Sequence, residues 1–359
     1  MSFDVDIAII GAGMAGASMA AEAASEASVL LIEAEDQPGY HSTGRSAAFW
    51  AESYGGPFVQ PLTTASGPFL ERHGFLSPRG GLHIADSDGL DALVGLEAEF
   101  GERVGFERLD RAGLEARLPG LRGGWVAGLF EPSCRDIDVA GLHGFYLAQA
   151  RRNGAKLLTG AEVRGLRRDE RSWAVETAAG PLRAGLLVNA AGAWADRVAV
   201  MAGAPPVGLQ PYRRTLSQLR VDPPAPHDLP LVMDALERFY FKPEAGGRLW
   251  LSPHDETPCD PCDCAAEELD VAIAIDRLER TVDWRVERVE RSWAGLRSFA
   301  PDRRPVYGFD PVVPRFFWFA GQGGFGIQTA PAAAKLAAAL VLGRTPELDA
   351  EPYAPSRFR

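Results

Sequence analysis

Apolar runs and turns near the start of the chain predict a strand, a helix and a second strand. Residues Val5–Ile10 form a short apolar run typical of a buried strand, and the glycine-rich stretch 11–16 follows at once. Ala17–Ser25 consists of small, helix-forming residues, and Val29–Ile32 is a second apolar run. This order within about thirty residues indicates a βαβ unit.

Similar patterns recur along the chain. We expect a helix at Leu142–Arg152, strands at Lys156–Leu158, Glu162–Arg167 and Trp173–Glu176, a buried strand over residues 186–192, a strand at Phe316–Ala320 and a helix at Thr329–Leu342. The strands on either side of the polar turn 168–171 are predicted to be antiparallel.

Two intervening stretches, residues 76–135 and 206–300, have a different pattern. They are richer in proline, charge and mixed alternation, which favours an antiparallel sheet. We therefore expect an α/β protein in which a Rossmann-like domain of residues 1–75, 136–205 and 301–359 carries an inserted α+β domain of residues 76–135 and 206–300. The inserted domain is predicted to be built on an antiparallel sheet and to bind the substrate.

Composition excludes several classes of protein. The 359 residues are 46% apolar and carry a net charge of −11, with no long basic run, which excludes disorder and argues against nucleic-acid binding. A signal peptide needs a basic start, yet the first basic residue is Arg45. The apolar segment Ala330–Leu342 is too short to span a membrane and is interrupted by Lys335. We expect a cytoplasmic protein with no integral membrane segment and no nucleic-acid partner.

Three of the four cysteines, Cys259, Cys262 and Cys264, crowd into one polar loop. A structural zinc site usually takes four ligands from two such groups, and His254 is the only further ligand nearby. We interpret the segment as a polar loop with incidental thiols and predict no metal site.

The glycines of the first turn fit a dinucleotide-binding motif. Gly11, Gly13 and Gly16 follow a strand and open a helix, which suits a tight turn, close approach of a pyrophosphate and close helix–strand packing. Glu33 follows Gly11 by 22 residues and ends the second strand, where a carboxylate accepts ribose hydroxyls. The helix N-terminus supplies free N–H groups and positive dipole to the diphosphate.

Three further segments indicate FAD rather than NAD. The stretch 40–48 has hydroxyls, a glycine and Arg45, which suit a diphosphate and a flavin edge, while 189–194 and 321–329 are two more glycine-rich turns after strands. A simple NAD domain would need only the first turn, whereas one cofactor held by several distant segments is typical of FAD.

The order of these segments resembles the D-amino-acid oxidase/glycine oxidase superfamily of FAD-dependent oxidoreductases. Within it, the chain is most similar to D-arginine dehydrogenase-type D-amino-acid dehydrogenases. The segments that carry the resemblance span nearly the whole chain and are residues 39–48, 189–194, 208–211, 213–214, 293–299 and 322–329. The resemblance implies a glutathione-reductase-type FAD domain, which is a βαβ unit plus a β-meander.

The resemblance also implies site residues. Arg214 and Arg297 match positions that bind the substrate carboxylate, and the planar guanidinium fork suits that pairing. Tyr240 matches a tyrosine that joins this contact, Tyr54 matches one that lines the pocket, and Gly324 is placed with them. The implied cofactor contacts are Gly11, Gly13, Met14, Ala15, Gly16, Glu33, Ala34, His41, Ser42, Thr43, Gly44, Arg45, Ser46, Ala47, Ala48, Val163, Ala191, Gly192, Trp194, Arg297, Gly321, Gly323, Gly324, Phe325, Gly326, Ile327, Gln328 and Thr329.

The activity implied is hydride transfer from the Cα–H of a D-amino acid to flavin N5, which gives an imino acid and then a 2-oxo acid and ammonia. The D-arginine enzymes hold the substrate guanidinium with a glutamate, where this chain has Gly81, and have a histidine and a threonine where it has Phe49 and Ala51. The substrate is therefore predicted to have a neutral or apolar side chain, because an unpaired buried charge is costly. Glu52 is the one residue that could supply a carboxylate to a charged side chain from a different direction.

Covalent flavin attachment in the sarcosine-oxidase branch uses Cys or His, and neither is present at the matching positions here, so we expect noncovalent FAD. Two alternatives stay open: a 2-hydroxy-acid or secondary-amine oxidoreductase of the sarcosine or glycine type, and a flavin-binding subunit without turnover. The electron acceptor, oxygen or a quinone-type compound, and the oligomeric state are also open.

Overall fold

The computed structural model describes residues 4–359. Its first sheet has eight strands, and parallel pairing runs in the order β9-β2-β1-β12-β20. The strands are β1 (Asp4–Ile10), β2 (Val29–Ile32), β9 (Lys156–Leu158), β10 (Val163–Arg168), β11 (Trp173–Thr177), β12 (Gly180–Asn189), β19 (Val306–Phe309) and β20 (Phe316–Ala320). The antiparallel β10-β11-β12 meander continues into the parallel sheet through β12, which confirms the predicted combination of βαβ unit and meander.

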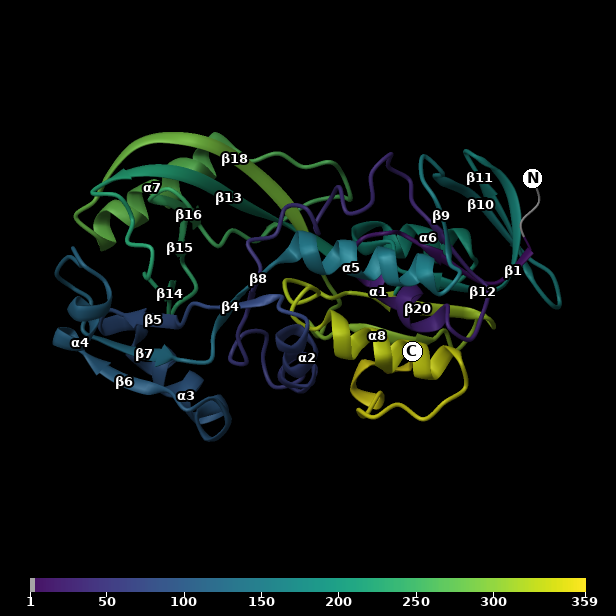
Figure 1. The fold of residues 1–359 in the computed structure, drawn as a ribbon, viewed down its shortest axis with the longest axis horizontal. Helices are drawn as coiled ribbons and strands as arrows, with labels where there is room; N and C mark the ends of the chain where they lie inside the picture. Colours follow the sequence, from purple (N-terminus) through teal and green to yellow (C-terminus); the bar gives the residue numbers. More distant parts are fainter. Residues whose placement is uncertain (1–3) are drawn as a thin grey trace.

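Helices cover both faces of this sheet. The long helices are α1 (Met14–Ala23), α2 (Gln60–Arg72), α5 (Val139–Arg152) and α8 (Ala330–Val341), and α6 (Ala195–Met201) is short. Figure 1 shows α1, α5 and α8 lying together, and α1 contacts both of the others. Alanines dominate α1 and α8, and their small side chains permit close approach around one buried core, whereas α6 packs with the meander around a second core.

The second sheet has nine strands. They are β5 (Gly81–Ala85), β6 (Glu107–Asp110), β7 (Ala127–Glu131), β13 (Gln210–Asp222), β14 (Leu231–Asp234), β15 (Tyr240–Glu244), β16 (Arg248–Ser252), β17 (Thr257–Pro258) and β18 (Arg285–Phe299). All pairings are antiparallel except that of β5 with β14, which is parallel. The expectation of an antiparallel sheet is therefore corrected at one position, where the two inserted segments meet edge to edge.

Three helices accompany the second sheet, namely α3 (Leu90–Val104), α4 (Arg111–Arg117) and α7 (Glu268–Thr281). One face of the sheet is covered by α7 and α4 around a core that includes Phe241 and Leu278. The opposite face contributes Leu216 and Tyr240 to a separate apolar cluster shared with residues 47–51. Alternate residues of each strand thus serve two different environments, as the two-residue period of a strand requires.

A small three-stranded sheet links the two parts. It consists of β3 (Phe49–Trp50), β8 (Arg135–Ile137) and β4 (Leu76–Pro78). The long strands β13 and β18 pair over most of their length and run from the second sheet back toward the first (Figure 1). Among residues 4–359, no helix has the length and apolar character needed to cross a membrane.

Candidate active site

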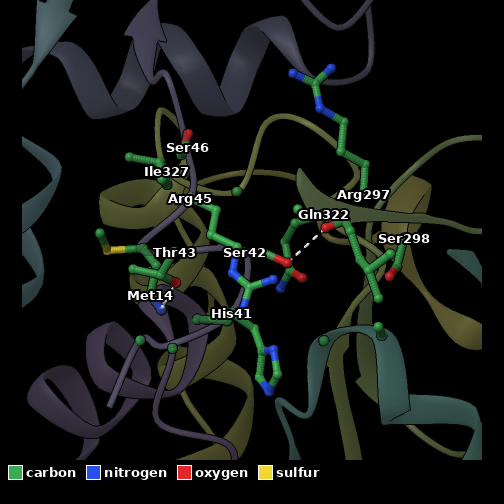
Figure 2. Close-up of a pocket in the computed structure, with 18 of the residues that line it drawn as sticks. Met14, His41, Ser42, Thr43, Arg45, Ser46, Arg297, Ser298, Gln322 and Ile327 are labelled. Carbon is green, nitrogen blue, oxygen red and sulfur yellow. Dashed lines mark hydrogen bonds between the residues drawn. The ribbon is translucent and has the colours of Figure 1, made fainter. Parts of the chain in front are cut away.

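A cavity lies where the glycine-rich turns of the first sheet meet the inner ends of β13 and β18. Its lining comes from residues 11, 13–15, 33, 39–43, 45–47, 190–194, 214, 216, 295–298, 322–324, 326 and 327, most of which are drawn in Figure 2. The predicted site residues that line it are Gly11, Gly13, Met14, Ala15, Glu33, His41, Ser42, Thr43, Arg45, Ser46, Ala47, Ala191, Gly192, Trp194, Arg214, Arg297, Gly323, Gly324, Gly326 and Ile327.

The first turn has no room for a side chain at Gly11 or Gly16. Gly11 has φ +100°, and a Cβ there would lie 2.4 Å from the main-chain oxygen of Ala190. A Cβ on Gly16 would lie 1.8 Å from the main-chain oxygen of Gly11. Gly13 and Gly192 line the cavity, and a Cβ on either would meet at most the Thr43 hydroxyl within 4 Å. The turn is therefore closed tightly on the protein side and left open on the cavity side, which fits a bound dinucleotide.

The carboxylate of Glu33 is fixed at the edge of this turn. Its Oε2 accepts the N–H of Ala12 at 2.8 Å and its Oε1 accepts the N–H of Glu35 at 3.1 Å. Across the cavity the Thr43 hydroxyl accepts the N–H of Met14 at 2.9 Å (Figure 2). These bonds hold the first helical turn and the acid in the arrangement expected for a nucleotide ribose and diphosphate.

His41 and Trp194 line the same part of the cavity. Their rings lie 4.7 Å apart, and His41 Nε2 donates to Glu35 Oε1 at 2.9 Å. The Ser42 hydroxyl donates to the main-chain oxygen of Leu296 at 2.7 Å. The segment after β2 is thus tied to strand β18, which carries Arg297.

Arg45 lines the cavity, but its donors are used by the protein. Its Nη1 donates to the main-chain oxygens of Cys264 and Ala294 at 2.9 and 3.1 Å, and its Nη2 pairs with Asp263. The cysteine loop therefore closes over Arg45. The expected contact of the Arg45 guanidinium with a diphosphate or flavin edge would compete with these bonds. Among residues 4–359, no group of three or more Cys, His, Asp or Glu side chains is placed to hold a metal ion.

Arg214 and Arg297 come from adjacent strands on one face. Arg214 on β13 is paired with Gly295 on β18, so Arg297 is its diagonal neighbour. A Cβ at Gly295 would lie 3.4 Å from Arg45 Cβ and 4.0 Å from Ser42 Cα, so the segment 42–45 packs against this part of β18. The guanidinium of Arg297 points away from His41 and Met14 (Figure 2).

The two arginines keep positive charge that the protein pairs only in part. Arg214 is only 3% exposed; its Nε donates to the Asp255 main-chain oxygen at 2.7 Å and its Nη2 to Glu256 at 3.2 Å, but Nη1 has no partner among the described residues. Burial, together with the charge of Arg297, lowers the pKa of Arg214. A small anion is therefore the group this pair can stabilise.

The two predicted tyrosines lie beside the arginines rather than in the cavity lining. The Tyr54 hydroxyl accepts a 2.6 Å bond from Arg297 Nη1, and the Tyr240 hydroxyl is buried without a partner among the described residues. A Cβ at Gly324 would lie 2.9 Å from Arg297 Nη1 and 3.0 Å from the Tyr54 hydroxyl. Gly324 thus keeps this corner open.

An apolar cluster borders the arginines. Its buried members are Ala47, Phe49, Ala51, Cys134, Leu216, Leu231, Met233 and Tyr240, with Tyr54, Trp250 and Trp293 packed against it. Ala47 and Leu216 also line the cavity, so the cluster forms its wall. A Cβ at Gly81 would lie 3.3 Å from Met233 Cε, which occupies the adjacent space. The Glu52 carboxylate accepts a hydrogen bond from the Thr64 hydroxyl on α2, and Glu52 is not among the residues that line the cavity.

His254 is held against the same group of charges. Its Nδ1 donates to the Glu237 main-chain oxygen at 2.6 Å, and its ring packs edge-on at 5.6 Å from Tyr240. Burial, together with Arg214, Arg297 and Arg303, lowers the pKa of His254 to about 2. The imidazole is therefore neutral at physiological pH.

This neutral histidine predicts a pH-dependent stability. The native pKa of His254 is depressed, so the unfolded chain binds a proton that the native chain does not, and stability is lost as pH falls below about 6.5. Between pH 6.5 and 5 the loss from one such group is about 1.5 kcal/mol. His254→Asn, which tolerates the φ of +56°, should flatten the decline of Tm with pH measured by thermal unfolding in excess FAD. An equal decline in both proteins would contradict this.

Several predicted cofactor residues do not line the cavity. They are Gly16, Ala34, Gly44, Ala48, Val163, Gly321, Phe325, Gln328 and Thr329. Val163 instead packs against the core beneath the meander. Gln328, 2% exposed, donates to the Tyr54 main-chain oxygen and accepts from the Ala51 N–H, so it fixes the loop that carries Tyr54. The side chain of Thr329 bonds the Phe325 main-chain oxygen and stabilises the turn.

Sequence reasoning missed some lining residues. They are Gly39, Tyr40, Ala190, Ala193, Leu216, Gly295, Leu296, Ser298 and Gln322. Leu216 was within reach of the sequence, because residues two apart on a strand share a face and Arg214 was already assigned. Ser298 and Gln322 lie in the segments 293–299 and 322–329 that carry the resemblance, but no individual contact is predicted for either from the sequence.

Comparison with known proteins gives concordant matches. Residues 6–340 match the model of a family described as FAD dependent oxidoreductase. Glycine oxidase of Pseudomonas aeruginosa is 29% identical over 385 residues, which covers 98% of each chain. Hydrogen cyanide synthase subunit HcnC of the same organism is 29% identical over 301 residues, 81% of this chain and 70% of that one. The crystal structure of glycine oxidase from Geobacillus kaustophilus shares the fold with a TM-score of 0.87, 24% identity and 99% coverage of both chains.

Proposed function

The chain belongs to the FAD-dependent oxidoreductase family, and from that premise we propose that it oxidises the Cα–N bond of an amino acid with a neutral or apolar side chain. The observation that carries the proposal is the buried pair Arg214 and Arg297, with an unpartnered Nη1 on Arg214, beside an apolar cluster. A carboxylate on the arginines and a side chain against the cluster account for both features.

The arginine pair sets the position of the substrate. Arg214 offers Nη1, Tyr240 offers its hydroxyl, and Arg297 is oriented by Tyr54. A carboxylate held by this fork has a fixed direction, so the substrate is held in one orientation in the cavity. The neutral amine form of the substrate is required, because its nitrogen lone pair drives the departure of the hydride.

The cofactor is FAD, and its chemistry when bound is acceptance of the hydride at N5; the product imino acid hydrolyses to a 2-oxo acid and ammonia. Glu33, the first turn and the segment 41–47 would hold its nucleotide part. We also propose that the FAD is noncovalent: acid precipitation would leave the yellow colour in the supernatant, and a yellow pellet would refute it. A cytoplasmic location and the two-domain division at 75/76, 135/136, 205/206 and 300/301 belong to the same proposal.

The narrower resemblance to D-arginine dehydrogenases stays a prediction, and so does preference for the D configuration. A glycine- or secondary-amine-oxidising activity is the second candidate, favoured by the full-length match to a glycine oxidase. The two candidates differ in the size of the substrate side chain. A glycine-type substrate has no side chain to contact the apolar cluster, whereas an apolar amino acid does.

A substrate panel tests the proposal. Anaerobic flavin reduction is measured with D- and L-amino acids, glycine, sarcosine and 2-hydroxy acids, and repeated in air to separate oxidase from dehydrogenase. We expect fastest reduction by an apolar amino acid, with arginine and lysine slower by at least about 100-fold, because their charge finds no counter-charge in the cluster. Arginine as the best substrate by kcat/KM would reject the side-chain assignment, and no reduction by any compound would leave a flavin-binding subunit.

Met233 is expected to limit the side-chain space. Its Cε fills the position beside Gly81, so Met233→Ala should raise kcat/KM for large apolar side chains relative to small ones by about tenfold. The ratio of kcat/KM for phenylalanine and alanine of the reactive configuration measures this. Met201→Ala, at the end of α6 and outside the cluster, is the matched control. An unchanged ratio would show that Met233 does not border the substrate.

A further inference from the structure

Glu131 is a fully buried carboxylate that the reaction itself does not require. It ends β7, directly opposite Gly81 on β5, and its side chain has no exposure to solvent. Among the described residues, the only basic group within 4.0 Å of it is His83, whose Nε2 lies 3.9 Å away and has no hydrogen-bond partner. Burying a carboxylate without a close cation is costly, so its hydrogen bonds must carry the compensation.

Those hydrogen bonds go to the loop before Tyr54. Glu131 Oε1 accepts the N–H of Glu52 at 3.0 Å, and Oε2 accepts the Ser53 hydroxyl at 2.5 Å. The Ser133 hydroxyl, in the turn that follows β7, also donates to Oε1 at 3.2 Å. Two of the three donors therefore belong to residues that directly precede Tyr54.

The same loop is held from the other side by the first domain. Gln328 accepts the Ala51 N–H at 3.2 Å and donates to the Tyr54 main-chain oxygen at 3.0 Å. Residues 51–54 are thus fixed between Glu131, at the end of β7, and Gln328, in the turn before α8. At the end of this loop, the Tyr54 hydroxyl accepts from Arg297 Nη1 at 2.6 Å.

We propose that Glu131 is a positioning residue for substrate binding, which acts through residues 52 and 53 to set the place of the Tyr54 hydroxyl on Arg297. This inference rests on the proposed function, because it assigns the carboxylate-binding role to Arg297. A carboxylate accepts stronger hydrogen bonds than an amide does, so glutamine of the same shape would loosen the loop. The orientation of Arg297 would then be less well defined, and substrate binding weaker.

The experiment is a double-mutant cycle in the FAD-loaded enzyme. Glu131→Gln is made in the wild-type and Tyr54→Phe backgrounds, and two quantities are measured: KM for the best amino acid, and the Kd of benzoate from the change in the flavin spectrum. We expect Glu131→Gln alone to raise both by about tenfold with kcat changed less than about threefold, and to have less than a twofold effect once Tyr54 is phenylalanine. Ser53→Ala should show the same dependence on Tyr54.

The outcomes separate a positioning role from a structural one. Ser133→Ala is the control, because it removes a donor to the same carboxylate that is not in the Tyr54 loop, and it should leave Kd unchanged. Equal effects of Glu131→Gln in both backgrounds, or a fall in Tm with unchanged KM and Kd, would overturn the proposal. If Glu131→Gln does not fold, the Ser53→Ala cycle decides by the same criterion.

Failure of the proposed function is distinguishable. Benzoate binding coupled to Glu131, without turnover of any amino acid, would reject the reaction and keep the inference. Turnover with additive effects would keep the reaction and reject the inference. A wild-type enzyme that neither binds benzoate nor oxidises an amino acid would reject both.

Discussion

Replacing Arg297 by methionine is expected to lower kcat/KM for the amino-acid substrate by roughly 30- to 5,000-fold, since losing one partner of a buried charge pair costs about 2–5 kcal/mol. Its Nη1 meets only the Tyr54 hydroxyl, and no carboxylate of the protein forms an ion pair with it among residues 4–359. Methionine keeps much of the volume and removes the charge. Steady-state kinetics give kcat/KM, and the ratio of flavin to protein absorbance should remain unchanged.

Two comparison variants sharpen this result. Arg297→Lys keeps the charge but loses the planar fork, so its kcat/KM should fall between those of the wild type and Arg297→Met. Arg291→Met is the matched control, because Arg291 lies on the same strand but is exposed on the outside of the molecule. A change of less than threefold in Arg297→Met would remove Arg297 from substrate binding. Loss of FAD from that variant would assign it to the cofactor instead.

The parts of the fold predicted well are those specified by contacts close in sequence. Hydrophobic periodicity and glycine positions predict the first strand, the turn and helix that follow it, and the meander. The structure has these elements within a few residues of the expected bounds. The parallel pairing of β5 with β14 has no such signal, because it joins segments separated by about 150 residues whose local patterns equally suit an antiparallel neighbour.

The site shows the same division. Glu33 and the glycines of the first turn could be placed from spacing alone, and Arg214 and Arg297 from resemblance. Arg45 could be placed at the cavity but not given its partners, because Asp263 and Cys264 lie more than 200 residues away. The resemblance places Gln328 among the cofactor contacts, and in the structure its amide fixes residues 51 and 54. Local sequence indicates which residues reach a site, while the partners that occupy their hydrogen bonds come from the tertiary fold.

The thiol loop illustrates why a motif needs its structural context. Cys259, Cys262 and Cys264 looked incidental by spacing, and their side chains form no metal-binding group in the described part of the chain. The main chain of the loop nevertheless holds Arg45 through Cys264, and Asp263 also accepts from the Tyr40 hydroxyl at 3.0 Å. The contribution of this segment to the cavity is therefore made by its backbone and its aspartate rather than by sulfur.

Gly16→Ala is expected to abolish FAD binding and to lower stability severely. The new Cβ would lie 1.8 Å from the main-chain oxygen of Gly11, and that oxygen belongs to a turn that cannot yield, since Gly11 itself is packed against Ala190. Overpacking against side chains costs about 1–3 kcal/mol, and a clash with the main chain of Gly11 exceeds that range. The N-terminus of α1 would have to move away from β1, which removes the diphosphate position. The flavin content of the purified protein and its Tm measure the two effects.

Two glycines provide a graded comparison for that variant. A Cβ on Gly13 would lie 3.2 Å from the Thr43 hydroxyl, a side-chain atom that can shift, so Gly13→Ala should fold and bind FAD about ten- to a hundredfold more weakly. Gly144 lies within α5 with open space around its Cβ position, so Gly144→Ala should raise stability by up to about 1 kcal/mol and leave FAD binding unchanged. Stoichiometric FAD in Gly16→Ala, or equal FAD affinity in the Gly13 and Gly144 variants, would refute the assignment of this turn to the diphosphate. The expected order of decreasing FAD affinity is therefore the Gly144, Gly13 and Gly16 variants, because Gly144 lies in α5 outside the cavity lining, Gly13 lines the cavity, and Gly16 has no space for a Cβ.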